Sequence, residues 1–233
     1  MSIKFNEENG EWDRGGIPCY YQPDFVNSEF LIFFGANPYE ANYGPTNFAE
    51  RLTDGLVSGR LKWAVVDPRL SKTASRAWKW VPIKPGGDGA LLMGMIRWII
   101  ENKRYDAKYL GNANRGAAMA SGEPSWSDLT WLVKIDEEGP AAFLRGEEIG
   151  QDDKGYDTTF FVVIKDGKPL AFKSYDQENP VEGDLLFDGE VNGIRVKTAF
   201  QILWEEASLH TLEQWAELAG ITVDDIVELA SEF

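Results

Sequence analysis

Two short apolar runs, each ending in a polar residue, dominate the stretch between Glu29 and Asp88. EFLIFFGAN leads into Asn37, and LKWAVVDPR leads into Asp67. A short, continuous apolar run bounded by turn residues is typical of a strand buried on both faces of a parallel sheet. The sequence therefore predicts neighbouring parallel strands whose carboxyl ends carry polar side chains.

The spacing of apolar residues extends this pattern to most of the chain. It predicts strands at 30–34, 61–66 and 80–83, and helices at 45–56 and 90–101. TTFFVVIKDGKPLAFKSY predicts a β-hairpin turning at Asp166-Gly167, and DLLFDGEVNGIRV predicts a second hairpin-like unit. Thr198, Thr211 with Gln214, and Thr222 with Asp225 mark the starts of three C-terminal helices.

This order predicts the α/β class: a Rossmann-like, doubly wound, mostly parallel sheet with a β-hairpin-containing insertion and a helical C-terminal tail. We expect four segments. They are an irregular lead-in at 1–28, a Rossmann-like cofactor-binding core at 29–110, an insertion with β-hairpins at 111–196, and a helical segment at 197–233 that we expect to be truncated.

Composition excludes several classes of function. A net charge of -15 over 233 residues argues against binding to nucleic acid or to an anionic membrane surface. The single cysteine, Cys19, and the single histidine, His210, are too few for a disulfide, a Cys/His zinc site or an iron–sulfur cluster held by this chain. We expect Cys19 to be inert and His210 to be a surface or capping residue. No apolar run reaches membrane-spanning length, so we expect no membrane insertion, and MSIKFNEENGEW does not resemble a secretion signal.

Three polar positions are the candidate binding residues. Ligands on open α/β sheets lie at the carboxyl ends of the strands, where Asn37, Asp67 and Asp88 are expected to project. Each position also has a structural interpretation. GANPYE can be an ordinary strand-to-helix turn, Asp67 can form an Asp-Pro turn with Arg69 as its local partner, and Asp88 can cap the following helix. Taken together, the three positions favour a nucleotide-like ligand.

A longer comparison of motifs identifies a family. IFFGANPYEANYG and VVDPRLSKTASRAWKWVPIKPGGDGALLMGMIRWIIENKRYDAKYL closely resemble the catalytic subunits of molybdopterin oxidoreductases of the dimethyl sulfoxide reductase superfamily. ASGEPSWSDLTWLVKI, FLRGEEIG, VNGIRVKTAFQILWEEA and TLEQWAELAGITVDDIVELASEF look most like tetrathionate reductase catalytic subunits, with thiosulfate or polysulfide reductases next. The resemblance runs from about Pro23 to Phe233.

The resemblance implies a molybdenum bis(molybdopterin guanine dinucleotide) cofactor, with this chain holding one of the two dinucleotides. The implied contacts follow the three motifs. Gly35, Ala36, Asn37 and Glu40 line the phosphate and pterin side, Asp67 and Arg69 with Pro68 between them contact the ribose or base, and Gly86, Gly87 and Asp88 contact the guanine.

The chain also departs from the family pattern. The [4Fe–4S] cysteine motif and the Cys, selenocysteine or Ser ligand to molybdenum are not found in it, so we assign no catalytic and no metal-ligating residue. We expect a central piece of a longer catalytic subunit, either an expressed fragment or a truncated gene product. In isolation this piece is expected to be inactive and could hold no ligand.

The resemblance further implies the activity, partners and location of the whole enzyme. The implied reaction is two-electron reductive cleavage of tetrathionate into two thiosulfates. The implied partners are the rest of the catalytic subunit, a membrane anchor and an iron–sulfur electron-transfer subunit. The family usually works in the periplasm or at the outer face of the cytoplasmic membrane, whereas this chain alone leaves the location unknown. A free-standing nucleotide-binding module and a ligand-free structural or assembly domain are the alternative hypotheses.

Overall fold

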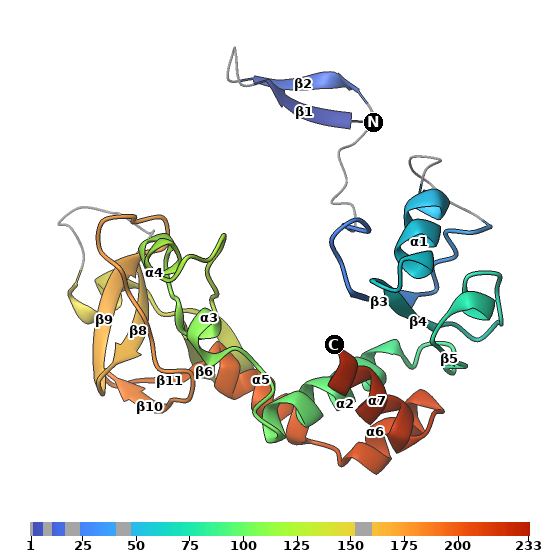
Figure 1. Ribbon diagram of the computed structural model, residues 1–233. Helices are drawn as coiled ribbons and strands as arrows, with labels where there is room; N and C mark the ends of the chain where they lie inside the picture. Colours follow the sequence, from blue (N-terminus) through green and yellow to red (C-terminus); the bar gives the residue numbers. More distant parts are fainter. Residues whose placement is uncertain (1, 7–10, 17–23, 41–47, 152–159) are drawn as a thin grey trace. The chain divides into compact units, whose positions relative to one another are not determined.

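The computed structural model describes residues 2–6, 11–16, 24–40, 48–151 and 160–233. The chain divides into two compact units, Met1–Pro82 together with Phe233, and Ile83–Glu232, whose elements are labelled in Figure 1. The division into four segments stays a prediction, and each of the two units is considered by itself.

A three-stranded parallel sheet forms the centre of the first unit. Its strands lie in the order β3 (Phe30–Phe34), β4 (Lys62–Val66) and β5 (Lys79–Val81). Helix α1 (Phe48–Val57) connects β3 to β4, and the 3-10 helix η1 (Ala74–Arg76) lies between β4 and β5. Because the strands are parallel, the residues that follow β3 and β4 lie at the same edge of the sheet.

The core of the first unit accounts for its apolar runs. Trp63 and Leu52 are completely buried, and the Phe25 and Phe48 rings pack edge to face with centroids 5.0 Å apart. Burying one such side chain contributes about 1.5–3 kcal/mol. The cluster consists of Phe25, Phe33, Phe48, Leu52, Leu61, Trp63, Val65 and Ala74.

Two strands lie inside the N-terminal segment that was expected to be irregular. β1 (Ser2–Asn6) and β2 (Glu11–Gly16) pair antiparallel, with Phe5 opposite Trp12. The expectation is therefore corrected for these two stretches. Aromatic residues favour strands, and the glycines and prolines of this segment had been given too much weight.

Four helices pack together in the second unit: α2 (Asp88–Glu101), α5 (Ala199–Ser208), α6 (Leu212–Ala219) and α7 (Val223–Glu232). Gly94 permits the close approach of α2 and α7, because a Cβ at this position would lie 2.9 Å from Ile226 Cδ1. The predicted capping pairs are confirmed. Gln214 N donates to Thr211 Oγ1 at 3.3 Å, and Asp225 N donates to Thr222 Oγ1 at 3.2 Å.

The remainder of the second unit is mainly antiparallel. One sheet has the order β10 (Asp188–Val191), β11 (Ile194–Thr198), β6 (Leu132–Asp136) and β7 (Gly139–Phe143), and β8 (Phe160–Lys165) with β9 (Lys168–Lys173) forms a hairpin. Two short helices, α3 (Ala107–Gly111) and α4 (Arg115–Ser121), lie between α2 and β6, and the 3-10 helix η2 (Gly146–Ile149) lies between β7 and β8. Asp166 and Gly167 have φ angles of 52° and 74°, as the predicted hairpin turn requires.

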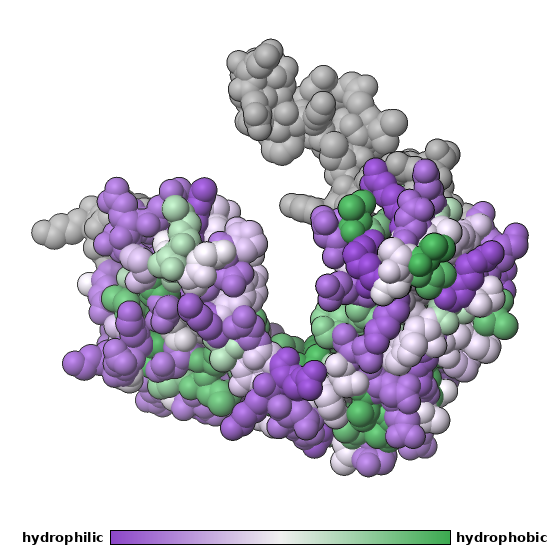
Figure 2. Space-filling model, viewed as in Figure 1, coloured by the Kyte–Doolittle hydropathy of each residue, from purple (hydrophilic) through white to green (hydrophobic). Residues whose placement is uncertain are grey.

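The predicted α/β class is confirmed, with a parallel sheet, antiparallel hairpins and a helical C-terminal part. On the face shown in Figure 2 the described surface is mostly hydrophilic, with scattered apolar side chains. Among the described residues, no helix is both long enough and apolar enough to cross a membrane.

Candidate functional site

The chain turns sharply where β3 ends. Gly35 has a φ of 59°, which favours glycine, and its N–H donates to Val66 O at 3.0 Å. Asn37 then begins a turn that closes when Glu40 N donates to Asn37 O at 3.0 Å, with Pro38 at the second position. Gly35 and Ala36 are exposed, and Asn37 is half-buried.

Asp67 terminates β4 and organises its own turn. Its carboxylate accepts from Arg69 N at 2.7 Å, and its carbonyl accepts from Trp80 Nε1 at 2.8 Å. The interpretation of Asp67 as an Asp-Pro turn residue with Arg69 as its local partner is thus confirmed, and the partner atom is the backbone N–H of Arg69. The Arg69 side chain points elsewhere, toward Glu40, and both Pro68 and Arg69 are exposed.

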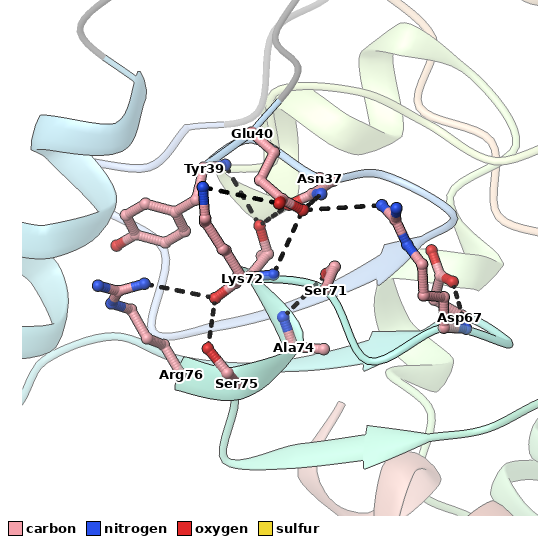
Figure 3. A network of polar contacts seen from close by, with 11 residues as sticks. Asn37, Tyr39, Glu40, Asp67, Ser71, Lys72, Ala74, Ser75 and Arg76 are labelled. Atoms are coloured by element: carbon pink, nitrogen blue, oxygen red, sulfur yellow. Dashed lines mark hydrogen bonds and ion pairs between the residues drawn. The ribbon is translucent and has the colours of Figure 1, made fainter.

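A relay of hydrogen bonds links the two turns. The fully buried Thr73 hydroxyl donates to Asn37 Oδ1 at 2.6 Å and accepts from Tyr39 N at 3.2 Å. Asn37 Nδ2 in turn donates to the Glu40 carboxylate. Figure 3 shows the Asn37 and Glu40 side chains pointing toward each other above the loop that contains Lys72. The buried Thr73 hydroxyl therefore positions the Asn37 amide, and the Asn37 amide positions the Glu40 carboxylate.

Two cations lie against the Glu40 carboxylate. Arg69 NH2 is 3.7 Å from Glu40 Oε2, and Lys72 Nζ is 3.8 Å from Glu40 Oε1. Lys72 N also donates to Glu40 Oε2, at 3.4 Å. Hydrogen bonds from the Asn37 amide and from Lys72 N lower the pKa of Glu40 below its ordinary value of 4.5, and the charges of Lys72 and Arg69 act in the same direction. Glu40 is thus an anion over the neutral pH range.

A shallow recess opens beside this ion pair. It has a volume of about 260 Å³ and is lined by Glu40, Arg69, Leu70, Ser71, Lys72 and Ser75. Two cations and two hydroxyls at its wall are groups that bind phosphate oxygens.

The glycine turn before α2 belongs to the second unit. Gly86 is exposed with a φ of 84°, and Gly87 N donates to Lys84 O at 2.8 Å. Gly87 is buried, and a Cβ there would lie 2.9 Å from the Cα and carbonyl oxygen of Ala219. Helix packing alone therefore requires glycine at position 87.

Asp88 is the first residue of α2 and not its cap. The N-cap is Gly87, which makes no side-chain capping bond, so the interpretation of Asp88 as an N-cap is wrong. The exposed carboxylate still lies in the first turn of a helix, where negative charge is favourable.

The structure thus brings together Asn37, Glu40 and Arg69, and it places Gly86, Gly87 and Asp88 in the other unit. Sequence reasoning missed the loop after VDPR. Ser71, Lys72, Thr73 and Ser75 lie in LSKTAS, a polar cluster directly after the second strand, and that cluster was the available signal.

The single cysteine and the single histidine of the chain are the remaining candidates. Cys19 lies outside the described residues. The half-buried His210 ring packs edge to face on Trp215, with centroids 4.5 Å apart, and its carbonyl accepts from Arg97. No group of three or more His, Cys, Asp or Glu side chains comes together as a metal site in the described parts of the chain.

Comparisons with known proteins show what this chain is similar to. The sequence model of the family described as "Molybdopterin oxidoreductase" matches residues 6–164. A selenate reductase subunit of Mesobacillus selenatarsenatis is 51% identical over 225 residues, which are 96% of this chain and 21% of that protein. A tetrathionate reductase subunit of Archaeoglobus fulgidus is 32% identical over 218 residues, which are 91% of this chain and 18% of that protein.

Acetylene hydratase from Pelobacter acetylenicus is a similar solved structure, with a TM-score of 0.48 and 20% identity over 90% of this chain and 17% of that one. Nothing about the site is inferred from this distant likeness. The chain spans about a fifth of the length of the two reductase subunits that it matches. The chain belongs to the molybdopterin oxidoreductase family.

Proposed function

We propose that this chain holds the guanine dinucleotide end of a molybdopterin cofactor, and that the loops after β3 and β4 bind its diphosphate. The observation that carries the proposal is the Asn37–Glu40–Arg69–Lys72 network, which gathers two exposed cations at the carboxyl edge of a parallel sheet. Family membership supplies the class of cofactor.

The recess is suitable for part of such a ligand. Its volume of about 260 Å³ is below the roughly 300–1,000 Å³ of pockets that enclose a drug-sized molecule. A diphosphate needs less room, and the Arg69 guanidinium with the Lys72 ammonium matches its charge. Asp67 is assigned to the ribose or base as a hydrogen-bond acceptor.

The cofactor carries the redox chemistry, and this chain positions it. The complete enzyme is proposed to reduce an oxyanion of selenium or sulfur. The 51% identity to a selenate reductase subunit favours selenate, and the 32% identity to a tetrathionate reductase subunit makes tetrathionate the second candidate. The rest of the catalytic subunit, a membrane anchor and an iron–sulfur electron-transfer subunit are the proposed partners.

Calorimetry on the 233-residue chain tests the nucleotide part of this proposal. We expect GDP to bind more tightly than GMP, because the Arg69 and Lys72 cations contact two phosphates of GDP and only one of GMP. Arg69→Ala/Lys72→Ala should reduce GDP affinity at least tenfold, since charge-assisted hydrogen bonds contribute about 1.5–3 kcal/mol each.

The matched control is Arg51→Ala/Lys168→Ala, which removes the same charge at exposed positions of α1 and β9. It should leave GDP affinity within about twofold of the unsubstituted chain, apart from weak long-range effects. Equal loss in both double variants, or no binding of GDP, would contradict the proposed site. GDP binding without preference over GMP would favour a simple nucleotide-binding module.

A further inference from the structure

Glu40 is an unexpected residue at a site proposed to bind phosphate. Its side chain lines the recess and carries a negative charge that repels an incoming anion. The same carboxylate contacts Arg69 and Lys72, the two cations that a diphosphate requires. Glu40 is therefore placed as a competitor for the cations, and it is unsuited to be a ligand of the phosphate.

The contacts of Glu40 with the described residues divide into two classes. On one side, Asn37 Nδ2 and Lys72 N donate to the carboxylate, and the buried Thr73 hydroxyl holds Asn37 in turn. On the other side, the Arg69 and Lys72 side chains approach to 3.7 and 3.8 Å, which is longer than a hydrogen bond.

The two cations are also more exposed to solvent than the carboxylate that they contact. The Arg69 and Lys72 side chains are 73% and 68% exposed, whereas that of Glu40 is 30% exposed. Ion pairs of this kind are weak and are readily exchanged. Hydrogen bonds from Asn37 and Lys72 N fix the Glu40 carboxylate, while the exposed Arg69 and Lys72 side chains can exchange it for another anion.

The net charge of the site determines which anions can displace Glu40. Arg69 and Lys72 together carry two positive charges, and Glu40 cancels one of them. A singly charged anion gains little by displacing Glu40, whereas a diphosphate supplies several charges and can hold both cations at once.

We propose that Glu40 is a built-in competing anion: it gathers Arg69 and Lys72 in the ligand-free protein and gives them up to the diphosphate when the cofactor binds. This inference rests on the proposed function and adds a mechanism of selection to it. Glu40 sets a threshold of negative charge, so that multiply charged phosphates bind and simple anions do not.

Calorimetry with inorganic pyrophosphate compares the chain with Glu40→Gln. The glutamine amide oxygen can still accept from Asn37 and from Lys72 N, while the competing charge is lost. Pyrophosphate affinity should rise about two- to tenfold, the effect of one or two exposed ion pairs. Nitrate, a singly charged anion, should bind measurably to the variant only.

Glu29→Gln is the matched control. Glu29 is an exposed carboxylate directly before β3, at the opposite end of the strand from Glu40, and the substitution removes the same charge. Pyrophosphate affinity should change less than about twofold in this variant, because exposed charges at a distance are screened. An equal rise of pyrophosphate affinity in both variants would show that Glu40 acts only through the net charge of the chain, and would overturn the inference.

The outcomes separate this inference from the proposed function. If the chain binds pyrophosphate and Glu40→Gln binds it equally or more weakly, the competing role is wrong and the diphosphate site stands. If neither protein binds pyrophosphate, both proposals fall.

A second measurement needs no substitution. Carboxyl carbon NMR of the unsubstituted chain follows the Glu40 titration with and without pyrophosphate. Hydrogen bonds from Asn37 and Lys72 N lower the pKa of Glu40 most, and the charges of Lys72 and Arg69 lower it further, so departure of the two cations should raise this pKa. An unchanged Glu40 titration at saturating pyrophosphate would show that the cations keep their partner, and would overturn the inference even if Glu40→Gln failed to fold.

Discussion

Two glycine-containing turns were predicted to serve the same cofactor, and the structure gives them different physical explanations. After β3, a Cβ on Gly35 would meet no atom of the described residues within 4 Å, and the polar residues of this turn organise exposed charges. Before α2, Gly87 is buried against Ala219, so packing explains it without any ligand. Packing therefore accounts for Gly87, whereas the backbone φ of 59° accounts for Gly35.

Gly87→Ala should have the largest effect on stability. The added Cβ meets backbone atoms of Ala219 at 2.9 Å, and backbone cannot move aside as a flexible side chain can. We expect about 3 kcal/mol of destabilisation, at the upper end for overpacking, measured by urea unfolding. Gly89→Ala is the control: the added Cβ meets nothing within 4 Å in the described parts of the chain and should stabilise α2 by about 0.5–1 kcal/mol. Equal effects of the two substitutions would refute the packing explanation.

Thr73→Val should have the next largest effect, in the first unit. It leaves Tyr39 N and Asn37 Oδ1 without the hydroxyl that joins them. We expect a loss of about 1–3 kcal/mol, the range for a buried polar group left unsatisfied. Thr73→Ser keeps the hydroxyl and should recover most of the stability. A valine variant as stable as the serine variant in urea unfolding would show that these two hydrogen bonds contribute nothing to the stability of the first unit.

Gly35→Ala should cost less than Gly87→Ala. No atom of the described residues lies within 4 Å of the added Cβ, so the cost is the backbone strain of a φ of 59°, about 1–2 kcal/mol. Urea unfolding of the two alanine variants side by side measures the difference. A larger loss at position 35 than at position 87 would reverse the comparison between the two turns.

The smallest expected effect concerns pH. The folded-state pKa of Glu40 is lowered, so this carboxylate contributes stability that is present above its unfolded pKa and is lost as pH falls through the lowered folded pKa. The stability advantage of the chain over Glu40→Gln should therefore shrink as pH falls below about 4.5. Urea unfolding at a neutral and at a strongly acidic pH checks the sign. An advantage that grew on acidification would contradict the assignment of Glu40 as the ordered anion.

The sequence predicted the elements well where the hydrophobic pattern is local. The parallel strands, the hairpin at Asp166-Gly167 and the two capping pairs follow from spacing and turn chemistry within a few residues. The packing of Gly87 against Ala219 could not be read in this way, because these residues are far apart in the chain and meet only through helix packing.

The candidate site was predictable in part. Asn37, Glu40 and Arg69 come from motifs at strand ends, whereas Lys72 and Thr73 lie in a loop whose polar residues look like ordinary surface. Their role depends on β3 and β4 being neighbours, which places residues 36 positions apart within hydrogen-bond distance. The roles assigned to Asp67 and Asp88 stay predictions.

The most direct test is the cofactor content of a chimera in which this chain replaces the matching segment of the Mesobacillus selenatarsenatis selenate reductase subunit, to which it is 51% identical. Molybdenum and guanine nucleotide would be quantified in the purified chimera, in its Arg69→Ala/Lys72→Ala variant and in the Arg51→Ala/Lys168→Ala control. We predict near-native contents of both in the chimera and the control, and a parallel loss of both in the Arg69→Ala/Lys72→Ala variant. Full molybdenum and guanine nucleotide contents in that variant would contradict the claim that these loops hold the cofactor.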